Sequence, residues 1–434
     1  MKGLITILLL LPMFRIGAQD SITISLTELL GKIESQNLQV RLQEQDVKTA
    51  EAELLQSRAM YLPNVTASYT AMATNNPLMA FGSKLNQARV TMSDFDPANL
   101  NDPGSVSNFA TKLEVQQPII NMDAVYQKKA GQVKTTVHRL KAEWTKDYLQ
   151  FEANKAYMQL QLSYKMLEAL YTARQATLAH KAMIDQYYKN GLVQQADVLQ
   201  VGVRVTEIEN QLQMARSNIR NASDYISFLL NEDYGEKVFK PENELVYEPQ
   251  LFPDTHPQLN KSRKDLQSYD KSLEIYDYML KSARSKSLPR LNAFGSFEMY
   301  DKSAMQFGAN GYMAGIQLSW NLFDGLRSKS EQSKYRAELN KAETGIAQYQ
   351  KQSQLELNKS YRQVLDAANK VSLGKQAWEQ AKEAYRIRKN RFGQGLEKTT
   401  DLLMAETQMS QKELEYQQAI FEYNVAAAHF KFLN

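Results

Sequence analysis

The sequence predicts a mainly α-helical protein with membrane β-strands, built as an internal tandem repeat of long antiparallel coiled-coil helices and β-hairpins. The repeat is visible in two turn motifs, Asn190-Gly191-Leu192 and Gln394-Gly395-Leu396, whose glycines are 204 residues apart. Leu62-Pro63 and Leu288-Pro289 each end a helical pattern and begin an alternating one. Glycine and proline are scarce, at 18 and 11 of 434 residues, which favours long helices.

The N-terminal segment has the pattern of a secretory signal peptide. Lys2 precedes an apolar run over residues 4–14, and the small pair Gly17-Ala18 closes the segment. We therefore expect residues 1–18 to be a signal peptide. No later apolar run approaches the roughly 20 residues of a membrane-spanning helix. Because the sequence has no cysteine, disulfides and an acylated lipoprotein cysteine are excluded, and the cell envelope is the expected compartment.

The first repeat is predicted over residues 19–231 and begins with a helical pattern over 25–61, for which Ser25 is the expected N-cap. Alternating apolar residues then predict a β-hairpin over 64–119, with strands near the length of about ten residues that suits a membrane β-strand. Its two strands are separated by a polar stretch over 75–108, which we expect to be a long solvent-exposed loop.

Two stretches of about 70 residues without proline predict helical rods, on the order of 100 Å long at 1.5 Å per residue. Within the first rod, apolar residues step by four and three, as in Leu149, Ala153, Ala156 and Leu160. This period of 3.5 residues indicates a helix that supercoils on a neighbour. In the first repeat we expect a long helix over 123–190, a tip over 190–196 and a return helix over 197–231.

The second repeat is predicted over residues 258–434, after an irregular linker over 232–257 that holds four prolines. Its expected parts are a helix, a β-hairpin over 291–321, a long helix over 324–392, a tip over 393–400 and a return helix over 401–434.

Four strands per chain cannot close a membrane barrel, and an open edge in lipid leaves backbone groups unpaired. Two chains would give eight strands and a plugged barrel, whereas three would give twelve strands with room for a pore. We therefore predict a homotrimer, although the strand count alone permits larger rings. Soluble β-hairpins packed on helices are the alternative. The signal peptide and the aromatic residues near the strand ends favour a barrel: Tyr61, Phe109, Tyr300, Tyr312, Trp320 and Phe323.

The sequence offers no pattern for catalysis, a cofactor or a metal. The formal net charge of +4 is spread along the chain without a basic block, so no nucleic-acid partner is expected. The four histidines share no metal-ligand spacing and are interpreted as solvated or packing residues: His138, His180, His256 and His429. We predict no enzyme activity, no metal site and no cofactor.

The ordered, duplicated motifs resemble those of the TolC family of outer-membrane efflux and secretion channels. Besides the two turns and the two Leu-Pro pairs, the strand exits Gln117-Pro118-Ile119-Ile120-Asn121 and Trp320-Asn321-Leu322-Phe323-Asp324 carry the resemblance. It implies a trimer in the outer membrane of a Gram-negative bacterium, in contact with outer-membrane lipid. It also implies a twelve-stranded barrel, continued by a twelve-helix periplasmic tunnel that the glycine turns close.

The resemblance further implies that the turns are tips that meet a periplasmic adaptor, the membrane fusion protein, which links the channel to an inner-membrane pump of the RND or ABC type. The docking residues implied by position are Gly191, Leu192, Val193, Gly395 and Leu396. Each glycine also supplies a positive φ between two helices. The implied gate residues are Asp197 and Asp401, which as residues near helix starts are also expected to cap.

Three residues depart from the family pattern near the tips. Phe392 and Glu397 replace a tyrosine and an arginine of the closing contacts, and Met404 replaces a second gate acid. The implied function is a passive exit duct in a tripartite efflux or type I secretion system. Whether the cargo is a drug, metal, lipid or protein stays open. The alternative is a periplasmic coiled-coil scaffold or adaptor that forms no pore.

Overall fold

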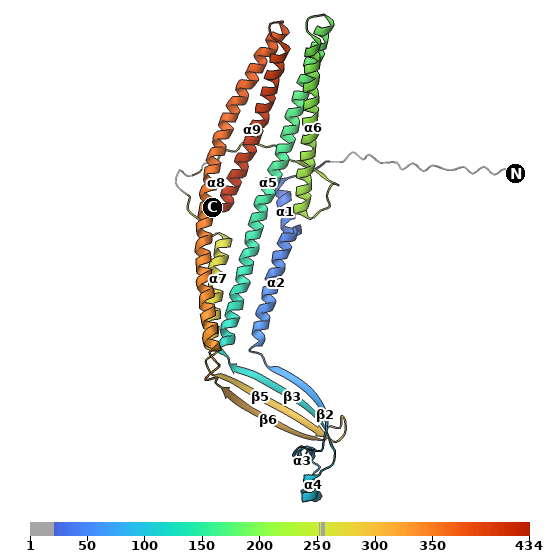
Figure 1. Cartoon of the computed structure of the whole chain (residues 1–434), viewed down its shortest axis with the longest axis vertical. Helices are drawn as coiled ribbons and strands as arrows, with labels where there is room; N and C mark the ends of the chain where they lie inside the picture. The colour runs from blue at the N-terminus through green and yellow to red at the C-terminus, as the bar shows by residue number, and fades with distance from the viewer. Residues whose placement is uncertain (1–20, 251, 253–256) are drawn as a thin grey trace, which may run out of the picture. The chain divides into compact units, whose positions relative to one another are not determined.

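The computed structural model describes residues 21–250, 252 and 257–434 (Figure 1). The predicted signal peptide, residues 1–18, lies outside the described residues. The chain divides into two units. Unit 1 comprises the described parts of 1–42, 143–260 and 350–434, and unit 2 comprises 43–142 and 261–349. The long helices α5 (Met122–Lys189) and α8 (Arg327–Gly393) contribute to both units.

Unit 1 is a bundle of helices with a buried apolar seam. It contains α1 (Leu26–Gln36), α6 (Gln195–Leu230) and α9 (Thr399–Leu433), together with the segments of α5 and α8 that belong to it. The predicted seam residues are buried, among them Leu149, Ala153, Ala156 and Leu160. The return helices α6 and α9 each begin two residues earlier than the sequence pattern indicated.

The first helix begins where its sequence predicts. The Ser25 side chain accepts a hydrogen bond of 3.1 Å from the Glu28 backbone N–H, which satisfies one of the free donors at the start of α1. The helix ends at Asn37 and the chain continues as α2 (Leu38–Ala59), so the predicted helical stretch forms two helices. The buried side chain of Asn37 donates to the backbone oxygen of Leu229 in α6 at 2.8 Å, which holds this break against the bundle.

A small parallel sheet in unit 1 lies where the sequence predicted only an irregular linker. Strand β4 (Val238–Pro241) pairs with β1 (Ser21–Ile24). Ile24 and Phe239 are both buried in one apolar cluster, and this burial stabilises the pairing. The linker predicted over 232–257 therefore contains a short strand that the sequence analysis did not predict. Its partner strand is more than 200 residues away, so no local pattern identifies it.

Unit 2 contains a four-stranded antiparallel sheet in the order β2-β3-β5-β6. The strands are β2 (Asn64–Thr74), β3 (Val106–Ile120), β5 (Arg290–Asp301) and β6 (Ala309–Ser319). The β3–β5 pairing joins the two predicted hairpins into one sheet. Among the described residues, β2 and β6 are the edges of this sheet, and each presents a row of backbone groups without a strand partner there.

The connection between β2 and β3 is long, as predicted, but it is folded into short helices that the sequence analysis did not predict. It holds α3 (Pro77–Asn86), the short 3₁₀-helix η1 (Met92–Phe95) and α4 (Pro97–Asn101). Asn76 and Asp96 each cap a helix whose first residue is proline, a position where proline is favoured. Pro77 and Pro97 are thus the first residues of α3 and α4.

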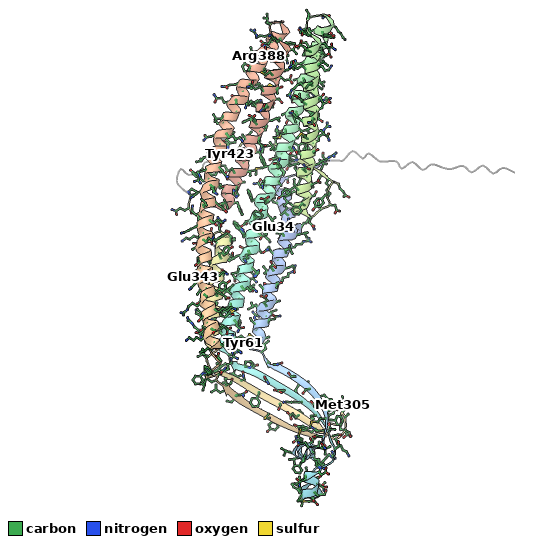
Figure 2. The ribbon with its side chains drawn as sticks, viewed as in Figure 1. Glu34, Tyr61, Met305, Glu343, Arg388 and Tyr423 are labelled. Carbon is green, nitrogen blue, oxygen red and sulfur yellow. The ribbon has the colours of Figure 1, made fainter. Side chains whose placement is uncertain are left out.

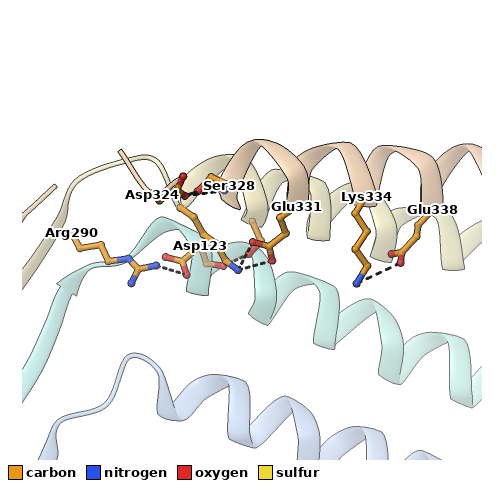
Figure 3. Close-up of polar contacts among 9 residues, drawn as sticks. Asp123, Arg290, Asp324, Ser328, Glu331, Lys334 and Glu338 are labelled. Carbon is orange, nitrogen blue, oxygen red and sulfur yellow. Dashed lines mark hydrogen bonds and ion pairs between the residues drawn. The ribbon is translucent and has the colours of Figure 1, made fainter. Parts of the chain in front are cut away.

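The base of the sheet is joined to the helices of unit 2 by polar contacts (Figure 3). Arg290, the first residue of β5, pairs with Asp123 near the start of α5 at 3.0 Å. Lys286 follows α7 (Lys264–Ser285) and pairs with Glu331 of α8 at 2.6 Å. These contacts tie the start of β5 to α5, and the end of α7 to α8.

Candidate functional site

The first turn, between α5 and α6, is closed by a pair of backbone hydrogen bonds. The N–H of Gly191 donates to Tyr188 O at 2.9 Å, and the N–H of Leu192 donates to Tyr187 O at 2.9 Å. This is the Schellman arrangement, which needs a left-handed residue after the helix. Gly191 has φ of +72°, so the glycine meets that requirement without Cβ strain.

The second turn, between α8 and α9, has the same backbone geometry. Gly395 has φ of +74°, and its N–H donates to Phe392 O at 3.0 Å. The N–H of Leu396 donates to Arg391 O at 2.9 Å. The two turns lie at the same end of unit 1 (Figure 1). The similarity of the two motifs in sequence is therefore matched by similarity in local conformation.

A shared apolar cluster lies beneath both turns and draws on all four adjoining helices. Its buried members include Ile184 of α5, Val201 of α6, Phe392 of α8 and Leu402 of α9. Since burial of each large apolar side chain is worth roughly 1.5–3 kcal/mol, this cluster holds the turns as one surface.

The five predicted docking residues differ in their exposure. Leu192 and Leu396, which follow the glycines, are 70% and 62% exposed. Val193, in contrast, is partly buried against the shared cluster. The exposed apolar surface of the turns is extended by Leu199 and Met404 on the return helices, which the sequence analysis did not select for docking.

The two predicted gate residues occupy corresponding positions but make different contacts. Each is the third residue of its helix, so neither is the N-cap itself. The Asp197 carboxylate accepts a hydrogen bond of 3.1 Å from the backbone N–H of Gln194, which caps the start of α6 from inside the helix. The Asp401 carboxylate instead lies 4.0 Å from the guanidinium of Arg388.

The second turn carries an ion-pair network. The sequence of the first turn does not contain the charged residues that form it. Glu397 accepts hydrogen bonds from Arg388 at 2.7 Å and from Arg391 at 2.8 Å. The hydrogen bond from Arg391 is the main reason that the pKa of Glu397 is lowered. Figure 2 labels Arg388 on α8 near this turn. Glu397, which replaces an arginine of the family pattern, thus links α8 to the turn within the chain.

Phe392, which replaces a tyrosine of the family pattern, is buried rather than available for a polar link. Its ring lies 5.8 Å from that of Tyr187 across the base of the two turns. The contact at this position is therefore apolar. Met404, in place of a second gate acid, is exposed and adds no charge.

Deeper in unit 1 lies a buried polar cluster that the sequence did not predict. Thr177 and His180 of α5 are fully buried against Tyr385 of α8 and Glu406 of α9. His180 was interpreted as a solvated or packing residue, and the structure makes it a buried hydrogen-bonding one. Leu170, Ala173, Thr177, His180 and Ile184 step by three and four, so polar residues at seam positions were the available signal.

The sheet of unit 2 has one apolar face. Residues that pair across an antiparallel sheet share a face, so Ala67, Leu113, Phe297 and Tyr312 form one row. Ile316 and Leu318 extend this face along β6. Its large apolar side chains are exposed in the single chain, a pattern that marks a lipid or protein interface.

The opposite face of the sheet is polar and charged. Lys112 of β3 lies 2.9 Å from Glu114 and 3.6 Å from Glu298 of β5. Tyr300 donates a hydrogen bond to Glu298. A face with two carboxylates and one ammonium group requires water, and so the two faces of the sheet suit two different surroundings.

Among the described residues, no helix is both long and apolar enough to cross a membrane. In the same part of the chain, no group of three or more histidine, aspartate or glutamate side chains is arranged to hold a metal ion. His138 is half-buried on α5, His429 packs against Phe151, and His256 lies outside the described residues.

The fold is that of outer-membrane channels. The chain is similar to a membrane protein from Pseudomonas aeruginosa, with 17% identity, coverage of 94% of this chain and 92% of that one, and a TM-score of 0.79. It is similar to the outer-membrane channel OprN, with 16% identity, 94% and 89% coverage and a TM-score of 0.80. It is also similar to the Campylobacter jejuni CmeC outer membrane channel, with 14% identity, 94% and 85% coverage and a TM-score of 0.78.

Residues 256–429 match the family model described as outer membrane efflux protein. No curated protein sequence matches the chain. The family match over this part of the chain and the fold of the whole support the resemblance to TolC-like outer-membrane efflux proteins that the sequence shows. They also confirm the expected location in the outer membrane of a Gram-negative bacterium. The family and the fold are those of channels rather than of enzymes.

Proposed function

We propose that this protein is the outer-membrane channel of a tripartite efflux or type I secretion system. It acts as a passive exit duct, without catalysis, and an inner-membrane pump of the RND or ABC type supplies the energy. A periplasmic adaptor connects the two. The family match supports the efflux role.

The observation that carries the proposal is the sheet of unit 2, which has an exposed apolar face, a charged opposite face and two unpaired edges. In lipid, each unpaired backbone group costs several kcal/mol, so β2 and β6 need partners. Three copies supply twelve strands and close a barrel, with the apolar face toward lipid and the Lys112–Glu298 face toward water. We therefore propose a homotrimer in which each chain is a tandem repeat.

The turns are the proposed docking surface for the adaptor. Leu192 and Leu396 offer exposed apolar side chains beside glycines held in a fixed conformation, and Gly191, Gly395 and Val193 shape the surface beneath them. A rigid backbone with projecting leucines favours binding because little conformational entropy is lost. The helices of three chains would form the periplasmic tunnel, with Asp197 and Asp401 as the proposed gate residues.

The turns are chemically unequal, and this supports two kinds of adaptor contact around the ring. Val193-Gln194-Gln195 in the first turn is uncharged, whereas Glu397-Lys398 occupies the second. The Arg388 and Arg391 pairs with Glu397 add further charge to the second turn only. We expect adaptor binding to the second turn to depend more strongly on ionic strength.

The proposal is tested by expressing the whole chain and separating the membranes. The expected result is an outer-membrane protein that, once purified in detergent, is a trimer and conducts ions across a planar lipid bilayer. A soluble monomer would instead support the pore-free periplasmic scaffold. A variant with Ile316→Arg, which places a charge on the apolar face, is expected to insert into the membrane less stably than the wild type.

A further inference from the structure

The folded connection between β2 and β3 is attached to the end of the sheet that is remote from the helices of unit 2 (Figure 1). Helix α3 contacts β3 and β6. Ala80 and Ser83 of α3 are buried, and so is Gln87, the C-cap of this helix. The Gln87 side chain donates to the Asn108 side chain at 2.8 Å and to the backbone oxygen of Asp301, the last residue of β5, at 3.0 Å. These bonds hold the end of α3 on the sheet.

Helix α3 lies on the polar face of the sheet, the face that carries Lys112 and Glu298. Because side chains alternate between the two faces of a strand, Val106 and Asn108 of β3 are on the same side as Lys112. Both are only 6% exposed, and Gln87 bonds to Asn108 on this side. In the proposed barrel this face lines the water-filled interior. The three copies of α3 therefore lie over the mouth of the barrel rather than over lipid.

The opposite face of α3 carries an apolar stripe. Leu78, Phe81 and Leu85 are spaced by three and four residues, two positions from the buried residues and so about 200° around the helix from them. Leu78 and Leu85 are 82% and 58% exposed. The 3₁₀-helix η1 enlarges this surface, since the ring of Phe95 lies 5.5 Å from that of Phe81, and Met92 is also exposed. We call these five residues the outer stripe.

The dimensions of the proposed trimer bring three outer stripes within reach of one another. Twelve strands about 4.8 Å apart and tilted by about 40° enclose a mouth roughly 24 Å wide between backbones. Three touching helices, each about 10 Å in diameter, span roughly 22 Å. Because each copy of α3 is attached on the inner side of its own sheet, the three helices meet over the mouth. An exposed apolar surface of this kind marks an interface.

We propose that the outer stripes of three chains pack against one another and form a lid over the outer mouth of the barrel. Each stripe is then covered by the same segment of the other two copies. The proposal rests on the proposed channel function, in which the lid restricts passage at the outer surface. Burial of the stripe residues favours the closed lid, and cargo that leaves the duct separates the three segments.

Cross-linking is a direct test because the sequence has no cysteine. Leu78→Cys and Leu85→Cys are made singly in the full-length chain, and outer membranes are treated with a short bifunctional thiol reagent. A covalent dimer of the chain is expected for at least one of these variants. Asn86→Cys is the matched control, since Asn86 is exposed on the same turn of α3 but points about 100° away from Leu85. It should give little dimer.

The second measurement is access to the barrel interior from outside the cell. Ser68 of β2 pairs with Lys112 and lies on the polar face, so Ser68→Cys places a thiol inside the barrel. A bulky, membrane-impermeant thiol reagent is added to whole cells. Burial of one leucine favours a packed state by about tenfold or more, so Leu78→Glu with Leu85→Glu should speed modification of this thiol by at least about tenfold. Asn86→Glu should leave the rate unchanged.

The outcomes separate the lid from the proposed function. A protein that is absent from the outer membrane, or monomeric in detergent, contradicts the channel function itself. A trimer that gives no dimer at either leucine, or whose modification rate is unchanged by the two glutamates, overturns the lid. A cross-link to a different protein assigns the stripe to that partner and also overturns the lid. If the double glutamate variant does not assemble, Met92→Glu decides, because this side chain is 87% exposed in the single chain.

Discussion

Arg290, the first residue of β5, donates a hydrogen bond of 3.0 Å to the carboxylate of Asp123, the second residue of α5 (Figure 3). The Asp123 side chain is only 6% exposed, whereas that of Arg290 is 43% exposed. The backbone oxygen of Asp123 also accepts from Ser282 of α7 at 3.1 Å. A single residue at the start of a long helix therefore ties a strand and a second helix to it within unit 2.

Arg290→Ala is expected to destabilise the assembled protein by about 1–3 kcal/mol, because it leaves the buried Asp123 carboxylate without its cation. The measurement is thermal unfolding of the purified protein in detergent. Lys334→Ala is the matched control, since Lys334 is 65% exposed and lies 3.9 Å from Glu338, and it should change stability by less than about 0.5 kcal/mol. Equal losses in the two variants would contradict the role assigned to Asp123.

Much of the helical and strand architecture could be predicted from the sequence because it has a local period. The seam residues Leu149 and Leu160 are buried because their spacing places them on one face of α5, and the alternation in β6 separates Ile316 from Gln317. The β1–β4 pairing could not be predicted, since it depends on a contact between Ile24 and Phe239 that has no local signature.

The candidate site was predictable to the extent that it depends on backbone conformation. The positive φ at Gly191 and Gly395 follows from helix-ending glycines in repeated motifs. The buried cluster could not be predicted, because the partners of His180 are Tyr385 and Glu406, which lie 205 and 226 residues further along the chain. Helical periodicity identifies a polar seam residue but does not identify what it meets on another helix.

The apolar face of the sheet should be intolerant of charge. Ile316→Arg is expected to cost about 2–4 kcal/mol if the residue faces the middle of the bilayer. Gln317→Arg places the same side chain on the opposite face of the same strand, one residue away, and should cost far less because that face lies toward water in the proposed barrel. The measurement is refolding into lipid vesicles as a function of urea. Similar costs at the two positions would mean that the sheet does not separate lipid from water.

The turn glycines should be required for transport rather than for assembly. Proline cannot adopt the positive φ of Gly191 or Gly395, and it removes the N–H that donates to Tyr188 or Phe392. Gly191→Pro and Gly395→Pro are therefore expected to abolish export while trimers still form in the outer membrane. Export is measured as survival in the presence of an inhibitory substrate or as secretion of a cargo protein.

Gly202→Ala is the matched control for these glycine variants. Gly202 lies inside α6, and no atom lies within 4 Å of an added Cβ. Alanine should therefore be neutral or stabilise the helix by up to about 1 kcal/mol, with normal export. Normal export in both proline variants would refute the docking role of the turns.

The ion pairs of Glu397 should stabilise the second turn and leave the first unaffected. The hydrogen bond from Arg391 lowers the pKa of Glu397, so its contribution is complete above its ordinary value of 4.5 and is lost as the pH falls through the lowered value. Glu397→Gln should therefore speed amide exchange at residues 394–398 at neutral pH, where the wild-type pairs are intact. The effect should be partial because Arg388 keeps its 4.0 Å contact with Asp401. Salt should narrow the difference in exchange rate between wild type and variant.

Exchange at residues 190–194 should not change, since the first turn is held by its backbone bonds and by Asp197. Faster exchange in both turns would show instead that the variant loosens the shared apolar cluster.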